Sequence, residues 1–320
     1  MLEGSRVLIT GGHGFLGGKV IQSLVSRGFK LTNRPPDPNQ IFSFRSSEFN
    51  LEDQHVVFDL VRYTRPDIII HLAARVGGIG ANQKHPGSFF YSNIMMGTSL
   101  IEAARICKVS KIVTVGTICA YPKYARVPFK EEELWEGYPE ETNAAYGIAK
   151  KALLVQGQAY RQEYGLNAIY LLPVNLYGPG DNFNPESSHV IPALIKKFVE
   201  ATETKTRVVD VWGTGAASRE FLYVDDAAEG IVLATDKYNE PDPVNIGNGR
   251  EITIRDLVEK IASMTGFRGL INWDKTKPDG QPRRCLNVDK AKIFGFEAKT
   301  GFDEGLKATI EWFQRLRNPE

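Results

Sequence analysis

A short strand, three spaced glycines and a helix at the start of the sequence constrain this 320-residue chain more than any other feature. The run Arg6–Thr10 is rich in β-branched residues and stops at Gly11, and apolar residues then recur at helical spacing up to Val25. Gly11, Gly14 and Gly17 stand in the turn, where glycine lets the backbone approach a pyrophosphate at the N-terminus of the helix. In this context the glycines predict a dinucleotide-binding unit rather than a simple glycine-rich turn.

Strand and helix patterns continue to alternate along the first half of the chain. Residues 67–72 and 111–115 are continuous apolar runs, which are typical of strands buried on both faces of a parallel sheet. Helical patterns cover residues 94–106 and 144–164, and residues 168–172 are strand-like again. The predicted fold class is therefore α/β, with a doubly wound parallel sheet of the Rossmann type and right-handed crossovers.

The alternation breaks down beyond about residue 173, where proline and glycine become frequent. We expect a dinucleotide-binding domain over residues 1–175, to which a later segment near 215–235 returns. Residues 176–320 are expected to form mainly a smaller α/β lobe that binds substrate. Its predicted elements are short strands at 208–211, 221–224 and 244–246 and helices at 254–264 and 302–315.

Charge and cysteine content exclude several classes of protein. The 39 basic and 38 acidic residues nearly cancel, so no global field attracts nucleic acid or an anionic membrane, and neither partner is expected. Cys107, Cys119 and Cys285 are an odd number of thiols without metal-ligand spacing, which predicts no metal site. Because the N-terminus has the pattern of a strand rather than of a signal peptide, a cytoplasmic protein is expected.

The segment after the expected second strand, Leu31-Thr32, bears on the choice of cofactor. An NAD site commonly places a carboxylate there against the ribose hydroxyls, but no carboxylate occurs before Asp37. Arg34 is available instead to pair with a 2′-phosphate, and His13 lies close by in the glycine turn. This pattern favours NADP(H), although Arg34 is also compatible with a solvated loop charge.

A second constellation has the composition of a carbonyl-reducing site. Tyr146 and Lys150 are four residues apart on a predicted helix and share a face, so the ammonium group can stabilise a phenolate. Thr117 follows a predicted strand at the edge where open parallel sheets carry their active sites, and Cys119 comes two residues later. A Tyr-x-x-x-Lys pair alone is often only helix surface, and a free cysteine is often only a small buried hydrophobe.

Taken together, these stretches and several others resemble the GDP-L-fucose synthases, within the extended short-chain dehydrogenases/reductases, along the whole chain. The cysteine two residues after the hydroxyl residue, the histidine of SHVIPAL and the KPDGQPRR segment are the most specific features. The matching stretches are Gly11–Gly17 (GGHGFLG), His71–Asn82 (HLAARVGGIGAN), Cys119–Lys123 (CAYPK), Thr142–Lys150 (TNAAYGIAK), Pro173–Phe183 (PVNLYGPGDNF), Ser188–Leu194 (SHVIPAL), Trp212–Val224 (WGTGAASREFLYV) and Lys277–Arg284 (KPDGQPRR).

The resemblance implies an activity and a role for individual residues. Such enzymes epimerise C3 and C5 of GDP-4-keto-6-deoxy-D-mannose and then reduce C4 with NADPH, and the resemblance also implies a homodimer. By resemblance, Thr117, Tyr146 and Lys150 form the reductase triad, and Cys119 and His189 are the base and acid of epimerisation. Cofactor contacts are expected at Gly11, Gly12, His13, Gly14, Phe15, Leu16, Gly17, Arg34, Leu72, Ala73, Ala74, Val115, Gly116, Lys150, Pro173, Val174, Asn175, Leu176 and His189. Substrate contacts are expected at Asn175, Lys197, Trp212, Arg219 and Asp279.

Other activities remain open at this point. A dehydratase is disfavoured because it needs carboxylates beside Thr117, and the Cys119–His189 pair argues weakly against a simple 4-epimerase. A 4-keto reductase without epimerisation, or an epimerase/reductase acting on another sugar such as a heptose, fits the residues nearly as well. Thr117 stands where fucose synthases usually have serine, and its extra methyl group bears on which sugar fits. A non-catalytic sensor would have no reason to keep all five catalytic residues together.

Overall fold

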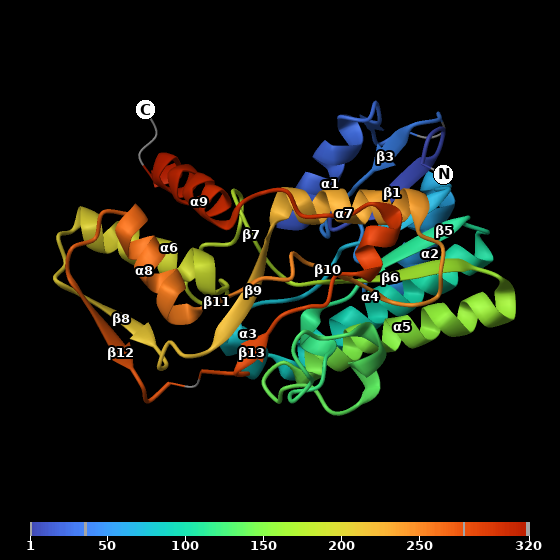
Figure 1. Ribbon diagram of the computed structural model, residues 1–320. Coiled ribbons are helices and arrows are strands. Elements are labelled where there is room, and N and C mark those ends of the chain that lie inside the picture. The colour runs from blue at the N-terminus through green and yellow to red at the C-terminus, as the bar shows by residue number, and fades with distance from the viewer. Residues whose placement is uncertain (1, 35–36, 278, 318–320) are drawn as a thin grey trace.

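The computed structural model describes residues 2–34, 37–277 and 279–317, and it is built around a seven-stranded sheet (Figure 1). The strand order is β10-β6-β5-β4-β1-β3-β2, and every pairing within it is parallel. Such a sheet is buried on both faces, which is why its strands are almost continuously apolar. The strands are β1 (Arg6–Thr10), β2 (Lys30–Leu31), β3 (Gln40–Phe42), β4 (Ile68–His71), β5 (Lys111–Val115), β6 (Asn167–Pro173) and β10 (Val244–Ile246).

Helices cover both faces of this sheet (Figure 1). On one face α1 (Phe15–Val25) packs against α7 (Val224–Lys237). On the other face α4 (Pro86–Ile106) packs against both α2 (Gln54–Thr64) and α5 (Ala144–Tyr164). The predicted α/β class with a doubly wound parallel sheet is thus confirmed.

A second hydrophobic core lies in the C-terminal half, under α6 (Val190–Glu203), α8 (Ile254–Met264) and α9 (Phe302–Arg317). These helices pack on one another beside two small sheets. The small sheets are made of β7 (Asn175–Tyr177), β9 (Ser218–Tyr223), β11 (Glu251–Thr253) and β13 (Arg283–Arg284), and of β8 (Val208–Trp212) with β12 (Leu270–Asp274). The chain returns from this region to the main sheet through α7 and β10. The domain boundary near residue 175 stays a prediction.

The neighbours of β1 differ from the expected arrangement. The expected second strand at residues 31–32 appears as β2, which lies at the sheet edge, and the strand beside β1 is β3. A strand of three residues is too short to produce a recognisable alternation of apolar and polar residues, and this explains why the sequence did not reveal β3. Helix α4 also begins well before residue 94, with Pro86 at its first position, where the missing N–H costs nothing.

Neither a membrane-spanning helix nor a metal cluster is found among the residues that the structure describes. No helix there is both long and apolar enough to cross a bilayer. Likewise, no group of three or more His, Cys, Asp or Glu side chains in the described segments is arranged to hold a metal ion. All three cysteines are free thiols.

Glu220 on β9 ties together three segments that meet near the cleft described below. Its side chain is fully buried, and its carboxylate accepts backbone N–H groups of Asn248 and Gly249 through Oε1 and of Leu286 through Oε2, at 2.6–2.8 Å. Burial raises the pKa of this carboxyl, and the three backbone donors oppose that rise. The three backbone N–H groups replace the hydrogen bonds that the buried carboxylate would otherwise make with water.

Replacing Glu220 with Gln should lower the free energy of unfolding by about 1–3 kcal/mol, because the new amide brings a donor to a position that now accepts N–H groups. Chemical denaturation monitored by fluorescence would measure the change. Glu251→Gln is a matched control, since Glu251 pairs with the exposed Arg283 and its loss should cost at most about 1 kcal/mol. Equal effects of the two changes would contradict this account of Glu220.

Candidate active site

One cleft, with a volume of about 1230 Å³, runs along the carboxyl ends of β1, β4, β5 and β6. Its opposite wall comes from α6 and from β8, β9 and the segment 279–284. This edge is where open parallel sheets bind their ligands. The volume exceeds that of ordinary small-molecule pockets, so the cleft has room for two large ligands side by side.

The glycine turn after β1 forms one end of the cleft. A Cβ atom on Gly17 would lie 2.1 Å from the Gly11 carbonyl oxygen, and one on Gly11 would lie 2.7 Å from the Ala73 nitrogen. Gly11 also has φ +75°, in the left-handed region that favours glycine. These contacts allow α1 to start against the sheet with its N-terminus open to the cleft, as pyrophosphate binding requires. Gly12 does not line the cleft, because it packs against Ser43 and Ile21.

The arginine expected to hold a 2′-phosphate lies away from the cleft. Arg34 does not line the cleft; its backbone N–H bonds to the Thr32 hydroxyl in an exposed turn beyond the edge strand. Because β3 lies beside β1, the residues after β3 occupy the position that the sequence assigned to the residues after β2. Arg45 lines the cleft there, and His13 lies close by, with its ring Nδ1 3.5 Å from the Ser43 hydroxyl.

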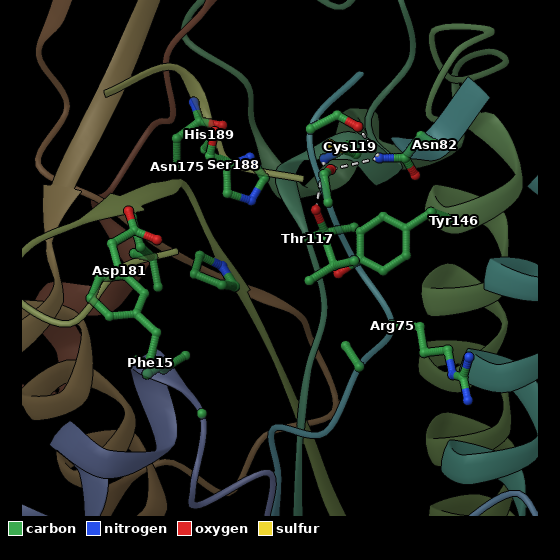
Figure 2. Close-up of a pocket in the computed structure, with 18 of the residues that line it drawn as sticks. Phe15, Arg75, Asn82, Thr117, Cys119, Tyr146, Asn175, Asp181, Ser188 and His189 are labelled. Carbon is green, nitrogen blue, oxygen red and sulfur yellow. Dashed lines mark hydrogen bonds between the residues drawn. The ribbon is translucent and has the colours of Figure 1, made fainter. Parts of the chain in front are cut away.

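Tyr146 and Lys150 lie on α5, which approaches the end of β5 very closely. A Cβ on Gly147 would sit 2.5 Å from the carbonyl oxygen of Cys119, so only glycine allows this approach. The helix thereby carries Tyr146 to the side of Thr117 and Cys119 (Figure 2). Tyr146 and Lys150 both line the cleft, as expected of two residues on one face of a helix.

Burial controls the ionisation of this pair. It raises the pKa of Tyr146, to which the neighbouring Cys119 adds, while a hydrogen bond from Thr117 lowers it. Burial lowers the pKa of Lys150 to about 8. Beneath the pair, His71 is buried and shares a 2.8 Å hydrogen bond with Thr10, and burial together with the Lys150 charge lowers its pKa. A neutral His71 is therefore a structural neighbour of Lys150 and does not line the cleft.

Thr117 and Cys119 lie across the cleft from His189 (Figure 2). Thr117 caps the short 3-10 helix η1 (Ile118–Ala120), where its hydroxyl oxygen accepts the Cys119 N–H at 3.2 Å. His189 is the N-cap residue of α6. As a whole residue His189 is exposed, but desolvation by the surrounding protein lowers the pKa of its imidazole. A thiol and an imidazole thus approach the same space from opposite walls.

The expected substrate-binding residues line the far end of the cleft, and their side chains differ in exposure and in hydrogen bonding. Lys197 and Trp212 are exposed, and Lys197 Nζ bonds only to the Asp210 carbonyl oxygen, at 3.0 Å, among the contacts that the structure describes. The Asp279 carboxylate is engaged by the backbone N–H and hydroxyl of Thr214, both at 2.7 Å. Asp279 therefore shapes the loop beside Trp212. Pro278, inside the KPDGQPRR motif, lies outside the described residues.

Most of the residues expected at the site line this one cleft. All five candidate catalytic residues and all substrate-binding candidates do so, and among the cofactor candidates Gly12 and Arg34 do not. The lining residues among the predictions are Gly11, His13, Gly14, Phe15, Leu16, Gly17, Leu72, Ala73, Ala74, Val115, Gly116, Thr117, Cys119, Tyr146, Lys150, Pro173, Val174, Asn175, Leu176, His189, Lys197, Trp212, Arg219 and Asp279.

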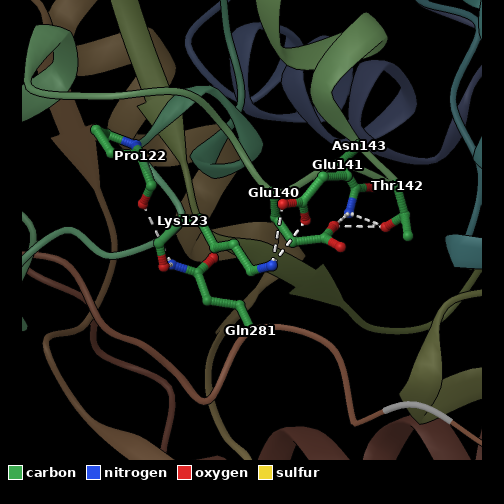
Figure 3. Close-up of polar contacts among 7 residues, drawn as sticks. All are labelled: Pro122, Lys123, Glu140, Glu141, Thr142, Asn143 and Gln281. Carbon is green, nitrogen blue, oxygen red and sulfur yellow. Dashed lines mark hydrogen bonds and ion pairs between the residues drawn. The ribbon is translucent and has the colours of Figure 1, made fainter.

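Several cleft residues went unrecognised in the sequence. Glu140, just before α5, is buried and accepts hydrogen bonds from Thr142 and Asn143 (Figure 3). Asp181 is also buried, its Oδ2 has no hydrogen-bond partner among the described residues, and burial raises its pKa to about 7. No local pattern identifies such residues, because their burial depends on segments far away in the chain. Arg284, the last residue of the KPDGQPRR stretch, also lines the cleft, and its contacts are described below.

The sequence and fold are similar to those of known enzymes. Residues 7–247 match the family described as "NAD dependent epimerase/dehydratase family". The chain is 39% identical to "Probable GDP-L-fucose synthase 1" of Oryza sativa subsp. japonica, over 97% of this chain and 92% of that protein. It superposes on a GDP-L-fucose synthetase from Naegleria fowleri bound to NADP with a TM-score of 0.87, at 27% identity over 99% and 97% of the two chains. For a GDP-6-OMe-4-keto-L-xylo-heptose reductase from C. jejuni the TM-score is 0.89, at 26% identity over 99% of both chains.

Proposed function

Since this chain belongs to the NAD dependent epimerase/dehydratase family, we propose that its cleft converts a GDP-linked 4-keto-6-deoxy-mannose to GDP-L-fucose. The reaction has two parts, epimerisation at C3 and C5 and reduction at C4. The chain is 39% identical to a probable GDP-L-fucose synthase over nearly its whole length. The observation that carries the proposal is the convergence of a phenol–ammonium pair, a thiol and an imidazole on one cleft.

The glycine turn and its surroundings fit a nicotinamide dinucleotide. The contacts of Gly11 and Gly17 leave the N-terminus of α1 facing the cleft, where side chains on those residues would overlap the backbone. Phe44, whose ring packs edge-on against Phe49 with centroids 4.9 Å apart, lines the adjacent wall and offers an apolar surface for an adenine. NADPH held there supplies a hydride to a carbonyl carbon. We propose NADPH rather than NADH because Arg45 and His13 line the cleft and would be available to hydrogen-bond a 2′-phosphate.

For reduction, Tyr146 donates the proton that the carbonyl oxygen needs. Because burial raises the pKa of Tyr146, its phenol is protonated at neutral pH. Lys150 lies one helical turn along α5, and its ammonium stabilises the phenolate that remains. Thr117 places a second hydroxyl beside Tyr146 to hold the same oxygen, in the manner of an oxyanion site.

For epimerisation, Cys119 and His189 exchange protons with carbon from opposite sides. The hydrogens at C3 and C5 are both α to the C4 ketone, so removing either one leaves an enolate whose oxygen is held by Tyr146 and Thr117. Inversion requires that a proton leave one face and return to the other, and the two groups approach from facing walls (Figure 2). Desolvation lowers the pKa of the His189 imidazole, which favours its neutral form.

The function is tested by incubating the protein with NADPH and a panel of GDP-linked 4-keto sugars in deuterated water. We expect NADPH oxidation together with deuterium at both C3 and C5 of the product, read by NMR. NADPH oxidation without deuterium uptake at C3 and C5 would indicate a 4-keto reductase that does not epimerise its substrate. The absence of oxidation with every sugar would refute the proposal.

The sugar itself has one specific competitor. The fold superposes, with a TM-score of 0.89, on a GDP-6-OMe-4-keto-L-xylo-heptose reductase from C. jejuni. Compared with serine, Thr117 carries an additional methyl group beside Tyr146, where the sugar is proposed to react. A heptose therefore belongs in the panel, and a higher kcat/KM for the heptose than for the 6-deoxyhexose would assign the chain to that substrate.

Arg45→Ala should raise the KM for NADPH by about ten- to one-hundredfold, because one charge-assisted bond to a phosphate contributes about 1.5–3 kcal/mol. The KM for NADH should change little, since NADH has no 2′-phosphate. Steady-state kinetics with both cofactors measures the two effects. Arg34→Ala is the matched control, because Arg34 does not line the cleft. A larger effect of Arg34→Ala would restore the assignment that the sequence favoured.

A homodimer through α4 and α5 is part of the proposal. Large apolar side chains are exposed on these helices, including Tyr91 and Tyr164, which are 55% and 47% accessible. Burying such a surface is the usual basis of subunit association. Light scattering of the purified protein gives the oligomeric state. The cytoplasmic location stays a prediction.

A further inference from the structure

Arg284 lies against the sulfur of Cys119. Its side chain is buried, with only 8% of the residue accessible, and its Nη1 donates a hydrogen bond to Cys119 Sγ at 3.6 Å. The neighbouring Arg283 points the other way, because successive side chains of a strand alternate, and it pairs with Glu251 near the surface. The two arginines of the KPDGQPRR motif thus have separate roles, and only Arg284 lines the cleft.

Gln281 holds the Arg284 guanidinium in this position. The Gln281 Oε1 accepts Arg284 Nε–H at 2.8 Å. The Gln281 Nε2 donates to the carbonyl oxygens of Lys123 at 2.7 Å and Pro122 at 3.4 Å (Figure 3). Gln281 is itself 4% accessible. Lys123 and Pro122 follow Cys119 in the same loop, so the amide links the guanidinium to the segment that carries the thiol. These hydrogen bonds therefore fix the distance between the Arg284 guanidinium and the Cys119 sulfur.

Charge around the sulfur is predominantly positive. Arg219 is held beside Arg284, and burial and then the Arg284 charge lower the pKa of Arg219 to about 10. Glu140, which also faces this cluster, contributes one negative charge, and the Asp279 carboxylate is engaged by Thr214. Two guanidinium groups facing few acidic groups in a poorly solvated place favour an additional negative charge. The sulfur of Cys119 is the adjacent atom that can carry one.

We propose that Arg284 holds Cys119 as a thiolate, and that Gln281 is the positioning residue that keeps Arg284 against the sulfur. A hydrogen bond from a permanent cation is stronger to a thiolate than to a neutral thiol. The role in catalysis rests on the proposed function. There the thiolate takes a proton from the carbon next to the ketone, the C–H bond breaks as an S–H bond forms, and the electron pair moves to the ketone oxygen. Arg284 keeps its proton throughout.

The thiolate is tested without substrate or cofactor by alkylation with iodoacetamide, in which an S–C bond forms and iodide leaves. Rates at each cysteine are followed by peptide mass spectrometry between pH 5 and pH 10. In the unmodified protein we expect Cys119 to react at pH 7 at least about tenfold faster than Cys107 and Cys285. Burial raises the pKa of both of those thiols, for Cys285 to about 12, so they are internal references.

Arg284→Met should slow the alkylation of Cys119 at pH 7 by about tenfold or more, with the rate recovering at high pH. Arg284→Lys should restore most of the rate, because it returns the positive charge. Gln281→Leu should give an intermediate loss, and Arg283→Met, the control one residue away, should change nothing. Circular dichroism checks that each variant is folded, and should Arg284→Met not fold, the Lys and Leu variants carry the test.

An unchanged pH dependence of Cys119 alkylation in folded Arg284→Met or Gln281→Leu protein would overturn the proposal. Faster alkylation of Cys119 in Arg284→Met would overturn it as well, because Arg284 would then only shield the sulfur. The proposed function fails separately, by the absence of deuterium uptake and NADPH oxidation in the unmodified protein. In that case a charge-dependent reactivity of Cys119 would still support the thiolate.

Discussion

Tyr146→Phe should lower kcat for NADPH oxidation by about 10²–10⁴-fold, the usual contribution of a positioned proton donor. The phenol is the group at the cleft that burial keeps protonated at neutral pH, and it lies beside Thr117 at the end of β5. Phe keeps the ring and its packing but removes the proton. Stopped-flow or steady-state absorbance of NADPH measures the loss.

Two measurements make the Tyr146 result specific. Tyr164→Phe makes the same chemical change on the same helix, at a position that does not line the cleft, and should leave kcat within about twofold. Deuterium exchange at C3 and C5 should fall less than reduction in Tyr146→Phe, because Thr117 still holds the enolate oxygen. A reduction rate within tenfold of the unmodified protein would show that another group supplies the proton.

Cys119→Ser should slow the entry of solvent deuterium at C3 and C5 by about 10²–10⁴-fold, because a serine hydroxyl is a far weaker base than a thiolate. Reduction of a ketone that has already been epimerised should stay within about tenfold, since Tyr146, Lys150 and Thr117 are untouched. NMR of the sugar in deuterated water follows exchange, and NADPH absorbance follows reduction. The ratio of the two losses is the informative quantity.

Cys107→Ser is the matched control for this change, since Cys107 lies at the C-terminal end of α4 away from the cleft. It should affect neither rate. Equal losses of exchange and reduction in Cys119→Ser would contradict a separate role for Cys119 and would indicate a general disturbance of the site. Comparing the losses of exchange and reduction in His189→Gln likewise shows whether His189 transfers protons or only lines the cleft.

The two arginines near the cofactor end show why local patterns did not suffice. Arg34 follows the expected second strand and precedes Asp37, the first acidic residue after that strand, which made Arg34 the natural candidate. Hydrogen bonding between β3 and β1 is a contact between distant segments, and it puts Arg45 at the cleft instead. No spacing near residue 34 carries information about which strand becomes the neighbour of β1.

The sequence by itself determined the parts of this protein that depend on local geometry. The glycine turn after β1 and the four-residue spacing of Tyr146 and Lys150 each lie within one strand–turn–helix unit or one helix, where backbone geometry follows from neighbouring residues. A resemblance to fucose synthases then linked Cys119 and His189, whose spacing alone means nothing.

Only the tertiary structure decided which residues meet. The sulfur of Cys119 and the guanidinium of Arg284 are 165 residues apart in the chain. They touch because β13 pairs with β9 on the wall of the cleft that faces Cys119. In the same way β10, expected in the smaller lobe, pairs with β6 and extends the main sheet. Such contacts follow from the strand order and from the packing of the two hydrophobic cores, and these depend on many weak long-range interactions rather than on any single motif.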